Sequence, residues 1–135
     1  TSYQLSAISY QLIRKAAAPL KGIHPHDVAM DLTEYQRAAG RTLNGSLDER
    51  ERLADAAAGL AEEAGEVLGL VRKHLYMRHE LDRERLTKEL GDALWCLSAV
   101  AGAVGVTLDE VAESNVAKLR ARYPEGYSDE ASKAR

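Results

Sequence analysis

Two groups of carboxylates are the residues of this chain best suited to chemistry. Glu62, Glu63 and Glu66 lie close together, and Glu89 and Asp92 form a second group further along. An α-helix turns by about 100° per residue, so Glu62 and Glu66 stack one turn apart with Glu63 on the adjoining edge. Glu89 and Asp92 pair in the same way. Five like charges converge only around a cation, and carboxylates favour a hard divalent metal such as Mg²⁺, so the pattern predicts a metal site that handles phosphates.

The neighbours of the first group distinguish it from an ordinary solvated helix face. A solvated face usually carries opposite charges at i±3 and i±4, as the alternating signs of residues 48–52 do. Around the first group those positions hold only Ala, Gly, Leu, Val or another Glu. The second group is less isolated, because Arg85 precedes Glu89 and Lys88 precedes Asp92 by one turn each.

Length and composition indicate one small domain. The 135 residues can bury a core, although small all-helical chains often complete theirs by oligomerising. The net charge of −3 and the pI of about 5.8 give no sign of nucleic-acid binding. No apolar run is long enough to cross a bilayer and no signal-peptide pattern is present, although Thr1 suggests that the true start is missing. A single cysteine, Cys96, fits a reducing compartment, so we expect a cytoplasmic protein.

Every clear periodicity in the sequence is helical. Apolar residues at positions 5, 8, 12 and 13 predict an N-terminal helix, followed by a connector over residues 23–30. Asp31 is expected to cap a short helix that ends at about Thr42. A capping box at residues 46–49 predicts the start of a long helix carrying the first acidic group.

Two further helices, each with its own N-terminal cap, are predicted in the second half of the chain. A turn is expected near residues 78–80, after which Asp82 caps a helix that Gly105 ends. A second capping box at residues 107–110 opens a last helix, which runs to about residues 123–124. The polar tail over residues 129–135 is expected to fray.

Each of the two acidic helices is expected to bury one apolar stripe. The stripe of the first helix is predicted to be Leu53, Ala57, Leu60, Ala64, Val67 and Val71. That of the second is predicted to be Leu86, Leu90, Ala93, Leu97, Val100, Ala101 and Val104. Small residues along the first helix (Ala56, Ala57, Ala61, Ala64, Gly65 and Gly69) predict closely approaching helices.

These elements predict an all-α fold, a bundle of four main helices with an extra N-terminal helix. Residues 1–30 would hold that helix and its connector, residues 31–128 the bundle, and residues 129–135 the tail. The apolar stripe of the N-terminal helix needs a partner surface, and a nucleotide-sized ligand needs more of its surface enclosed than four helices provide. A two-fold contact between copies of a chain is the commonest way to supply both. We therefore expect a homodimer or a homotetramer.

Basic side chains and one amide lie where they could contact the phosphates of a ligand. Lys73 follows Glu66 by two helical turns on the same stripe, so its ammonium could reach a phosphate oxygen. On the last helix Asn115, Lys118 and Arg122 share one edge. Ordinary roles are open for each, because basic residues near a helix end are often solvated and complement the helix dipole.

These motifs, in this order, resemble the MazG-like proteins of the all-alpha NTP pyrophosphohydrolase superfamily over Asp31 to Ser128. The matching elements are Leu32-Thr33-Glu34-Tyr35-Gln36, the E-E-x-x-E of Glu62, Glu63 and Glu66, Lys73-His74-Leu75, the E-x-x-D of Glu89 and Asp92, and Asn115-x-x-Lys118-Leu119-x-x-Arg122-Tyr123-Pro124-x-Gly126.

The resemblance implies a four-helix MazG-like bundle that hydrolyses a nucleoside triphosphate to the monophosphate and pyrophosphate. It implies that Glu63, Glu66, Glu89 and Asp92 hold Mg²⁺, with Mn²⁺ as a substitute. Glu62 would be a further metal contact or a group that orients water. The resemblance assigns nucleotide contacts to Lys73, Asn115 and Lys118, to which we add Arg122 from its place on the same helix edge, and it implies a pocket completed by a neighbouring subunit.

The chemistry of the residues agrees with this expectation and leaves two questions open. Carboxylates can meet an anionic triphosphate only through bridging cations, and a nearby carboxylate can take the proton of the attacking water. Glu62 and Glu63 are both candidates for that base. Which base or sugar the substrate carries does not follow from the sequence.

Other functions remain as alternatives. A phosphoribosyl-ATP pyrophosphohydrolase would cleave the same kind of bond, although the Lys73-His74 stretch and the last helix favour the MazG-like branch. A non-enzymatic helical adaptor would carry the acidic groups as surface features and bind no metal. A di-iron bundle needs E-x-x-H pairs, which the sequence lacks. A transition-metal site from His24 and His26 or from His74 and His79 is a weaker idea.

Overall fold

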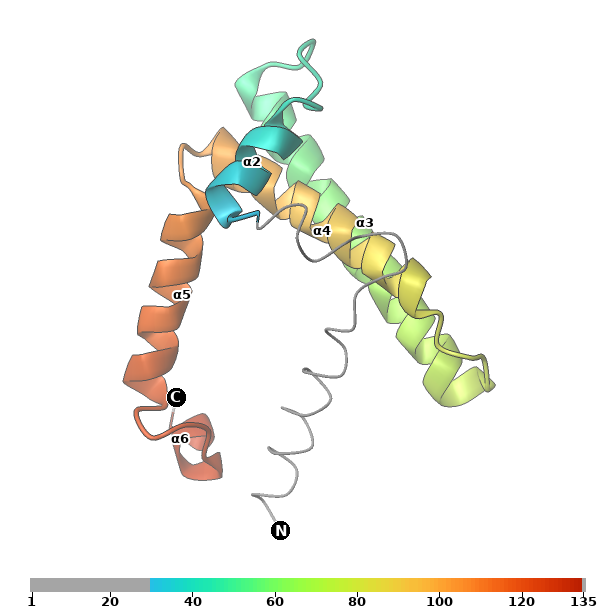
Figure 1. The fold of residues 1–135 in the computed structure, drawn as a ribbon, viewed down its shortest axis with the longest axis vertical. Helices are drawn as coiled ribbons and strands as arrows, with labels where there is room; N and C mark the ends of the chain where they lie inside the picture. The colour runs from blue at the N-terminus through green and yellow to red at the C-terminus, as the bar shows by residue number, and fades with distance from the viewer. Residues whose placement is uncertain (1–29, 135) are drawn as a thin grey trace. The chain divides into compact units, whose positions relative to one another are not determined.

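The computed structural model describes residues 30–134, which form five helices (Figure 1). The helices are α2 (Leu32–Gly40), α3 (Glu49–Met77), α4 (Arg83–Ala103), α5 (Leu108–Arg122) and α6 (Asp129–Lys133). No strand is present between residues 30 and 134, so the predicted all-α class is confirmed. The chain divides into two compact units, Thr1–Met30 and Asp31–Arg135. The predicted N-terminal helix and nearly all of its connector lie outside the described residues.

The helical hairpin of α3 and α4 is the scaffold of the second unit. The two helices lie side by side along most of their length and are joined by a short turn (Figure 1). Helix α2 packs on α4 and contacts α5, while α5 meets α4 near the connection between them. Both acidic groups lie on the hairpin, so the packing of α3 on α4 sets their separation.

Side chains at the helix starts explain why the elements begin where they do. Asp31, Asp48 and Thr107 each accept a hydrogen bond from the backbone N–H three residues on, within a reciprocal capping box. The boxes at Asp31 and Thr107 were predicted. The predicted box over residues 46–49 is wrong in position: Asp48 pairs with Glu51, and Ser46 is instead engaged with the side chain of Asn44.

The helix ends also follow the local chemistry. Arg78 closes α3 in the left-handed conformation with φ of 56°, a geometry that usually selects glycine or asparagine. Asp82 caps α4 by accepting from the N–H of Arg85 at 2.9 Å, as predicted. Gly105, with φ of 73°, follows the end of α4 and lets the chain turn towards α5.

Helix α2 is joined to the α4–α5 connection by side-chain hydrogen bonds. The Gln36 amide donates to the carbonyl oxygen of Val106 at 3.2 Å and accepts from the N–H of Leu108 at 2.9 Å. Thr33 donates to Asp109 on α5. These bonds fix the start of α5 relative to α2 and α4, although most of α5 is solvent-exposed.

The core of the described residues is small. Its buried apolar side chains are Ala56, Cys96, Ala101 and Leu108. The predicted burial of the α3 stripe is therefore wrong within one copy: Leu53, Ala57 and Ala64 are exposed, and the stripe is nowhere fully buried. The α4 stripe is mixed, since Ala101 is buried while Leu90 is 51% and Val104 is 56% exposed. Among the described helices α3 packs mainly against α4, so part of the surface of this hairpin has no third helix over it, which explains the difference.

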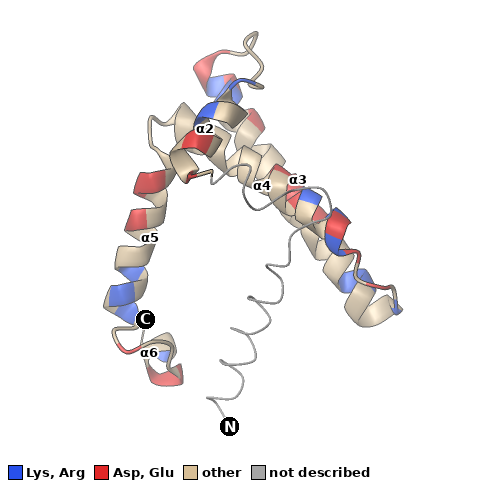
Figure 2. Ribbon diagram, viewed as in Figure 1, with Lys and Arg blue, Asp and Glu red and all other residues tan. Residues whose placement is uncertain are grey.

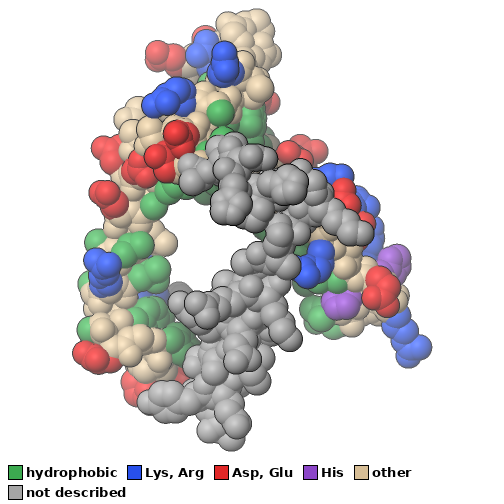
Figure 3. All heavy atoms as spheres, viewed as in Figure 1, with side chains coloured by type: hydrophobic (Ala, Val, Ile, Leu, Met, Phe, Trp, Pro, Cys, Tyr) green, Lys and Arg blue, Asp and Glu red, His purple; other side chains and the backbone are tan. Residues whose placement is uncertain are grey.

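Apolar side chains are exposed on both helices of the hairpin. They include Leu68 and Leu75 on α3 and Leu90, Leu94 and Leu97 on α4, of which Leu94 and Leu97 line a groove beside α5. Hydrophobic side chains also reach the surface over α5 and near the α3–α4 turn (Figure 3). Among the described helices none is by itself long and apolar enough to span a membrane; only α4 and α5 together, with a bend of 100° between them, pass on length and composition.

The C-terminal tail is more ordered than expected. Ser128 caps α6 by accepting from the N–H of Ala131 at 3.1 Å, and Arg122 donates to the carbonyl oxygen of Ser132 at 3.0 Å. The Arg122 guanidinium also lies 5.2 Å from the centre of the Tyr123 ring. The prediction that residues 129–135 fray is thus wrong for Asp129–Lys133.

Candidate metal centre

Three of the predicted ligands converge between α3 and α4. Glu63, Glu89 and Asp92 each offer a carboxylate oxygen within 4.8 Å of the others. Glu63 and Glu89 are half-buried, and Asp92 is exposed. Glu63 stands one turn after Gly59, where α3 approaches α4 closely, and this approach brings carboxylates of two helices into one group. We call Glu63, Glu89 and Asp92 the carboxylate triad.

The electrostatics of the triad show that its charges repel one another. Burial raises the pKa of Glu63 above its usual value of 4.5, and the negative charges of Asp92, Glu62 and Glu89 raise it further. Burial, followed by Glu63 and Asp92, likewise raises the pKa of the Cys96 thiol. A raised pKa keeps that thiol protonated, so Cys96 acts as a small core residue and not as a nucleophile.

The residues fit a hard divalent cation. Oxygens that share one Mg²⁺ at about 2.1 Å lie within about 4.2 Å of one another, so the triad needs only small side-chain adjustments. All three donors are carboxylate oxygens, which suit Mg²⁺ or Mn²⁺ better than soft metals. Besides burial, the neighbouring negative charges raise the pKa of Glu63, and a bound cation would relieve this repulsion. His74 and His79 belong to no such group among the described residues, and His24 and His26 lie outside them.

Glu66 lies apart from the triad in this structure. Its carboxylate is 3.9 Å from the guanidinium of Arg85, which also donates from Nε to Glu89 at 3.4 Å. Arg85 therefore bridges the two helices from the edge of the triad. Glu62 is exposed on α3 next to Glu63. It adds negative charge there but is not one of the three residues whose oxygens converge.

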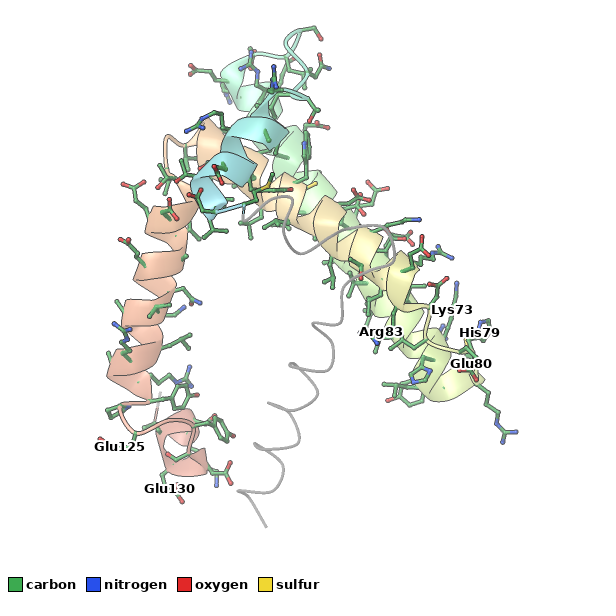
Figure 4. The ribbon with its side chains drawn as sticks, viewed as in Figure 1. Lys73, His79, Glu80, Arg83, Glu125 and Glu130 are labelled. Carbon is green, nitrogen blue, oxygen red and sulfur yellow. The ribbon has the colours of Figure 1, made fainter. Side chains whose placement is uncertain are left out.

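Lys73 lies towards the far end of the hairpin. It is exposed, and Figure 4 shows it near His79 and Glu80, where α3 turns into α4. It follows Glu66 by seven residues on the same side of α3, as the sequence predicted, but nearly three helical turns, about 15 Å along the axis, separate it from Glu63 of the triad. Only an extended ligand could contact both Lys73 and the triad.

Asn115 and Lys118 lie on the other side of α4 from the triad. They line a groove of about 660 Å³ together with Leu94 and Leu97 of α4. Leu94 follows Asp92 by two residues, which places it about 200° around the helix. One copy of the chain therefore does not bring Asn115 or Lys118 to the triad. Arg122 is further along α5, bonded to Ser132.

Sequence reasoning missed the contact of Arg85 beside the triad, and it named Tyr35 without placing it there. Arg85 was noted only as a neighbour of Glu89 in sequence, and its contact with Glu66 on the other helix depends on how the helices pack. Tyr35 on α2 is half-buried, and burial followed by the charge of Asp92 raises its pKa. The spacing of the residues does not predict that proximity, although Tyr35 belongs to a motif of the resemblance.

Charge is distributed differently on the hairpin and on α5. Acidic and basic side chains both occur on α3 and on α4, with an acidic stretch in the middle of α3, whereas α5 begins acidic and ends basic (Figure 2). Asp109 and Glu110 lie in its first turn, and Arg120 and Arg122 in its last. The basic end of α5 could attract an anion, but within one copy it does not face the triad.

Comparison with known proteins decides the family. A profile of the MazG nucleotide pyrophosphohydrolase domain matches residues 52–127, from the first turn of α3 to the turn before α6. The chain belongs to the MazG family. The gene 37 protein of Mycobacterium phage L5, a curated relative, is 33% identical over 105 residues, covering 72% of this chain and 92% of that protein. No solved structure matched the chain.

Membership of the MazG family agrees with the resemblance seen in the sequence motifs. The matched region contains the triad, Glu62, Glu66 and Lys73, together with Asn115, Lys118 and Arg122. It places the protein among the all-alpha nucleotide pyrophosphohydrolases. The roles of individual residues are the subject of the proposal below.

Proposed function

We propose that this protein hydrolyses a nucleoside triphosphate, NTP or dNTP, to the monophosphate and pyrophosphate in a Mg²⁺-dependent reaction, as part of nucleotide-pool house-cleaning. The observation that carries the proposal is the carboxylate triad, formed between α3 and α4 in a chain of the MazG family. Three oxygens within 4.8 Å, on residues that otherwise repel one another, form a group that needs a cation.

The triad residues would hold the metal. When bound, Mg²⁺ supplies charge neutralisation for the triphosphate and Lewis acidity at the α-phosphorus. Glu63, Glu89 and Asp92 are the ligands that the geometry supports directly, and Glu66 joins them if its side chain leaves Arg85. The half-buried position of Glu63 and Glu89 limits competition from water at these ligands.

The carboxylates beside the triad would handle the proton. Water attacks the α-phosphorus, a new P–O bond forms, and the bond from that phosphorus to the α–β bridging oxygen breaks, releasing pyrophosphate. The proton of the water passes to a carboxylate, for which Glu62 and Glu63 are both placed. Glu63 would also be a metal ligand, whereas exposed Glu62 has no ligand role among the triad and is free to accept the proton.

We further propose that a second copy of the chain completes the nucleotide site, in a homodimer or a homotetramer. Asn115 and Lys118 lie across α4 from the triad, so they can contact a nucleotide there only from another copy. The exposed apolar side chains of α3 and α4 offer that copy apolar surface to bury, and self-complementary two-fold contacts are common in small chains. Lys73 could then contact the outer phosphates of an extended triphosphate.

Product analysis tests the proposal most directly. Canonical and damaged NTPs and dNTPs would be incubated with the full chain and Mg²⁺, and the products separated by chromatography. We expect nucleoside monophosphate and pyrophosphate. Nucleoside diphosphate and orthophosphate would show cleavage at the wrong bond. Turnover of phosphoribosyl-ATP alone would favour the alternative pyrophosphohydrolase, and absence of Mg²⁺ binding by calorimetry would favour the adaptor.

Two expectations from the sequence stay predictions. We expect the protein to act in the cytoplasm on a free nucleotide, without a nucleic-acid or membrane partner. The net charge of −3 is the reason for excluding nucleic acid.

A further inference from the structure

Arg85 is the only cation that the described ion pairs place against predicted metal ligands. Its Nη2 lies 3.9 Å from Glu66 on α3, and its Nε lies 3.4 Å from Glu89 on α4. Asp82 caps the backbone N–H of Arg85 at 2.9 Å, which fixes its position in the first turn of α4. The guanidinium therefore occupies the edge of the triad from a rigid point of attachment.

We propose that Arg85 competes with the divalent metal for Glu66 and Glu89, and that it transfers to the phosphates when a nucleotide binds. The inference rests on the proposed function. Without nucleotide, the positive charge of Arg85 holds Glu66 away from the triad and repels an incoming cation. An anionic triphosphate offers the guanidinium a better acceptor, because guanidinium–phosphate pairs are charge-assisted and often bidentate.

The exposure of the three side chains supports an exchange of partners. Arg85 and Glu66 are 54% and 55% exposed, so either can rotate away without opening the core, whereas Glu89 is only 16% exposed and stays in place. Ion pairs between exposed side chains are weak. A metal with strong carboxylate affinity can therefore displace Arg85, at the cost of a lower apparent affinity.

Lys88 provides a matched control on the same helix. Its ammonium pairs with Glu84 at 3.0 Å, one turn back, and not with the triad. Arg85→Gln and Lys88→Gln each remove one positive charge from an exposed position of α4. A difference in Mg²⁺ affinity between these two variants therefore reports the contact of Arg85 with Glu66 and Glu89, because the change in net charge is the same in both.

The experiment is a calorimetric titration of the full chain with Mg²⁺ alone, without nucleotide. Arg85→Gln should bind Mg²⁺ about two- to fivefold more tightly than the wild type, while Lys88→Gln should stay close to it. Arg85→Lys keeps the positive charge but loses the planar guanidinium, so its Mg²⁺ affinity should lie between those of the wild type and Arg85→Gln. Equal affinities for Arg85→Gln and Lys88→Gln would overturn the inference. Thermal melts confirm that each variant is folded.

The second measurement follows the transfer to phosphate. At saturating Mg²⁺, Arg85→Gln should raise KM for the nucleoside triphosphate about tenfold while kcat changes less, because a charged hydrogen bond to substrate is lost. An unchanged KM would overturn the transfer. If the wild type binds Mg²⁺ and hydrolyses nucleotides but the variants match it, only this inference fails. If the wild type does neither, the proposed function fails with it.

Discussion

Gly59 on α3 lies directly against Cys96 on α4. A Cβ placed on Gly59 would come within 2.9 Å of the buried Cys96 Sγ, closer than real contacts allow. Glu63 follows Gly59 by one turn, and Asp92 precedes Cys96 by one turn. This close approach of a glycine and a cysteine therefore sets how far apart the turns that carry Glu63 and Asp92 lie.

Replacing Gly59 should consequently be costly, whereas replacing another glycine of α3 should not. Gly59→Ala forces Cys96 or the helix to move, and overpacking of this kind typically costs about 1–3 kcal/mol. Gly65→Ala meets no atom within 4 Å and should gain up to about 1 kcal/mol of helix propensity. Urea denaturation of both variants measures the difference. Cys96→Ala should rescue Gly59→Ala, and equal stabilities for the two glycine variants would contradict the contact.

Substitution of the predicted ligands should abolish most turnover while the helical fold persists. Glu63→Gln, Glu89→Gln, Asp92→Asn and Glu66→Ala should each lower kcat at least about 100-fold, since even outer-shell partners of a metal cost 10- to 100-fold. Glu84→Gln, on exposed α4 surface beside Lys88, is the control and should retain activity. Pyrophosphate release and circular dichroism provide the measurements. Unimpaired turnover by Glu66→Ala would remove Glu66 from the ligand set.

Removal of metal should reveal the repulsion within the triad. In EDTA, Glu63→Gln should melt at a higher temperature than the wild type, because one of the repelling charges is gone. With Mg²⁺ the wild type should melt at the higher temperature. A ligand at 100 times its Kd stabilises a protein by about 2.7 kcal/mol, and Glu63→Gln should bind Mg²⁺ poorly. Differential scanning fluorimetry with and without Mg²⁺ tests both. A wild type that is more stable than the variant in EDTA would contradict the repulsion.

Adjacent alanines on α3 test the interface between copies. Ala57 and Ala58 are both exposed in one copy, but they lie about 100° apart around the helix, and only Ala57 shares the predicted apolar stripe. Ala57→Glu should therefore dissociate the assembly, whereas Ala58→Glu should leave it intact. Light scattering at micromolar concentration measures the mass. A wild type that is active as a single 14.7 kDa chain would exclude the assembly.

Glu110 should give the protein a defined acid dependence. Hydrogen bonds from the backbone N–H and then the hydroxyl of Thr107 lower the pKa of Glu110 below its usual 4.5. Its carboxylate therefore stabilises the fold above pH 4.5, and this contribution is lost as the pH falls through the lowered pKa. Glu110→Gln should melt at a lower temperature than the wild type at pH 7, and the gap should close at acid pH. A gap that is independent of pH would contradict the role of the charge.

The helix boundaries were predictable because they depend on local chemistry. Asp31, Asp82 and Thr107 cap through hydrogen bonds to residues three positions away, and Gly105 permits the positive φ that follows α4. The cap of α3 was misplaced by two residues because Ser46 and Asp48 each begin a plausible box in sequence. Only the backbone path shows that Ser46 bonds to Asn44 instead.

Packing and burial were less predictable, because they depend on partners distant in the sequence. The apolar stripe of α3 looks like a core in the sequence, yet Ala57 and Ala64 are exposed in the structure. For the site, the convergence of Glu63, Glu89 and Asp92 agrees with the spacing of the acidic motifs. The position of Asn115 across α4 could not follow from spacing, since it depends on the direction in which α5 leaves the connection.

If a second copy covers the exposed apolar side chains, as proposed above, dilution becomes a destabilising condition for this protein. When the same apolar surface serves both folding and assembly, the unfolded fraction rises as total concentration falls, by mass action. Newly synthesised chains below the assembly threshold would expose that surface to proteases, whereas an established pool would be protected. The steady-state amount of protein would then respond more than proportionally to its rate of synthesis, so gene dosage becomes a regulator of activity.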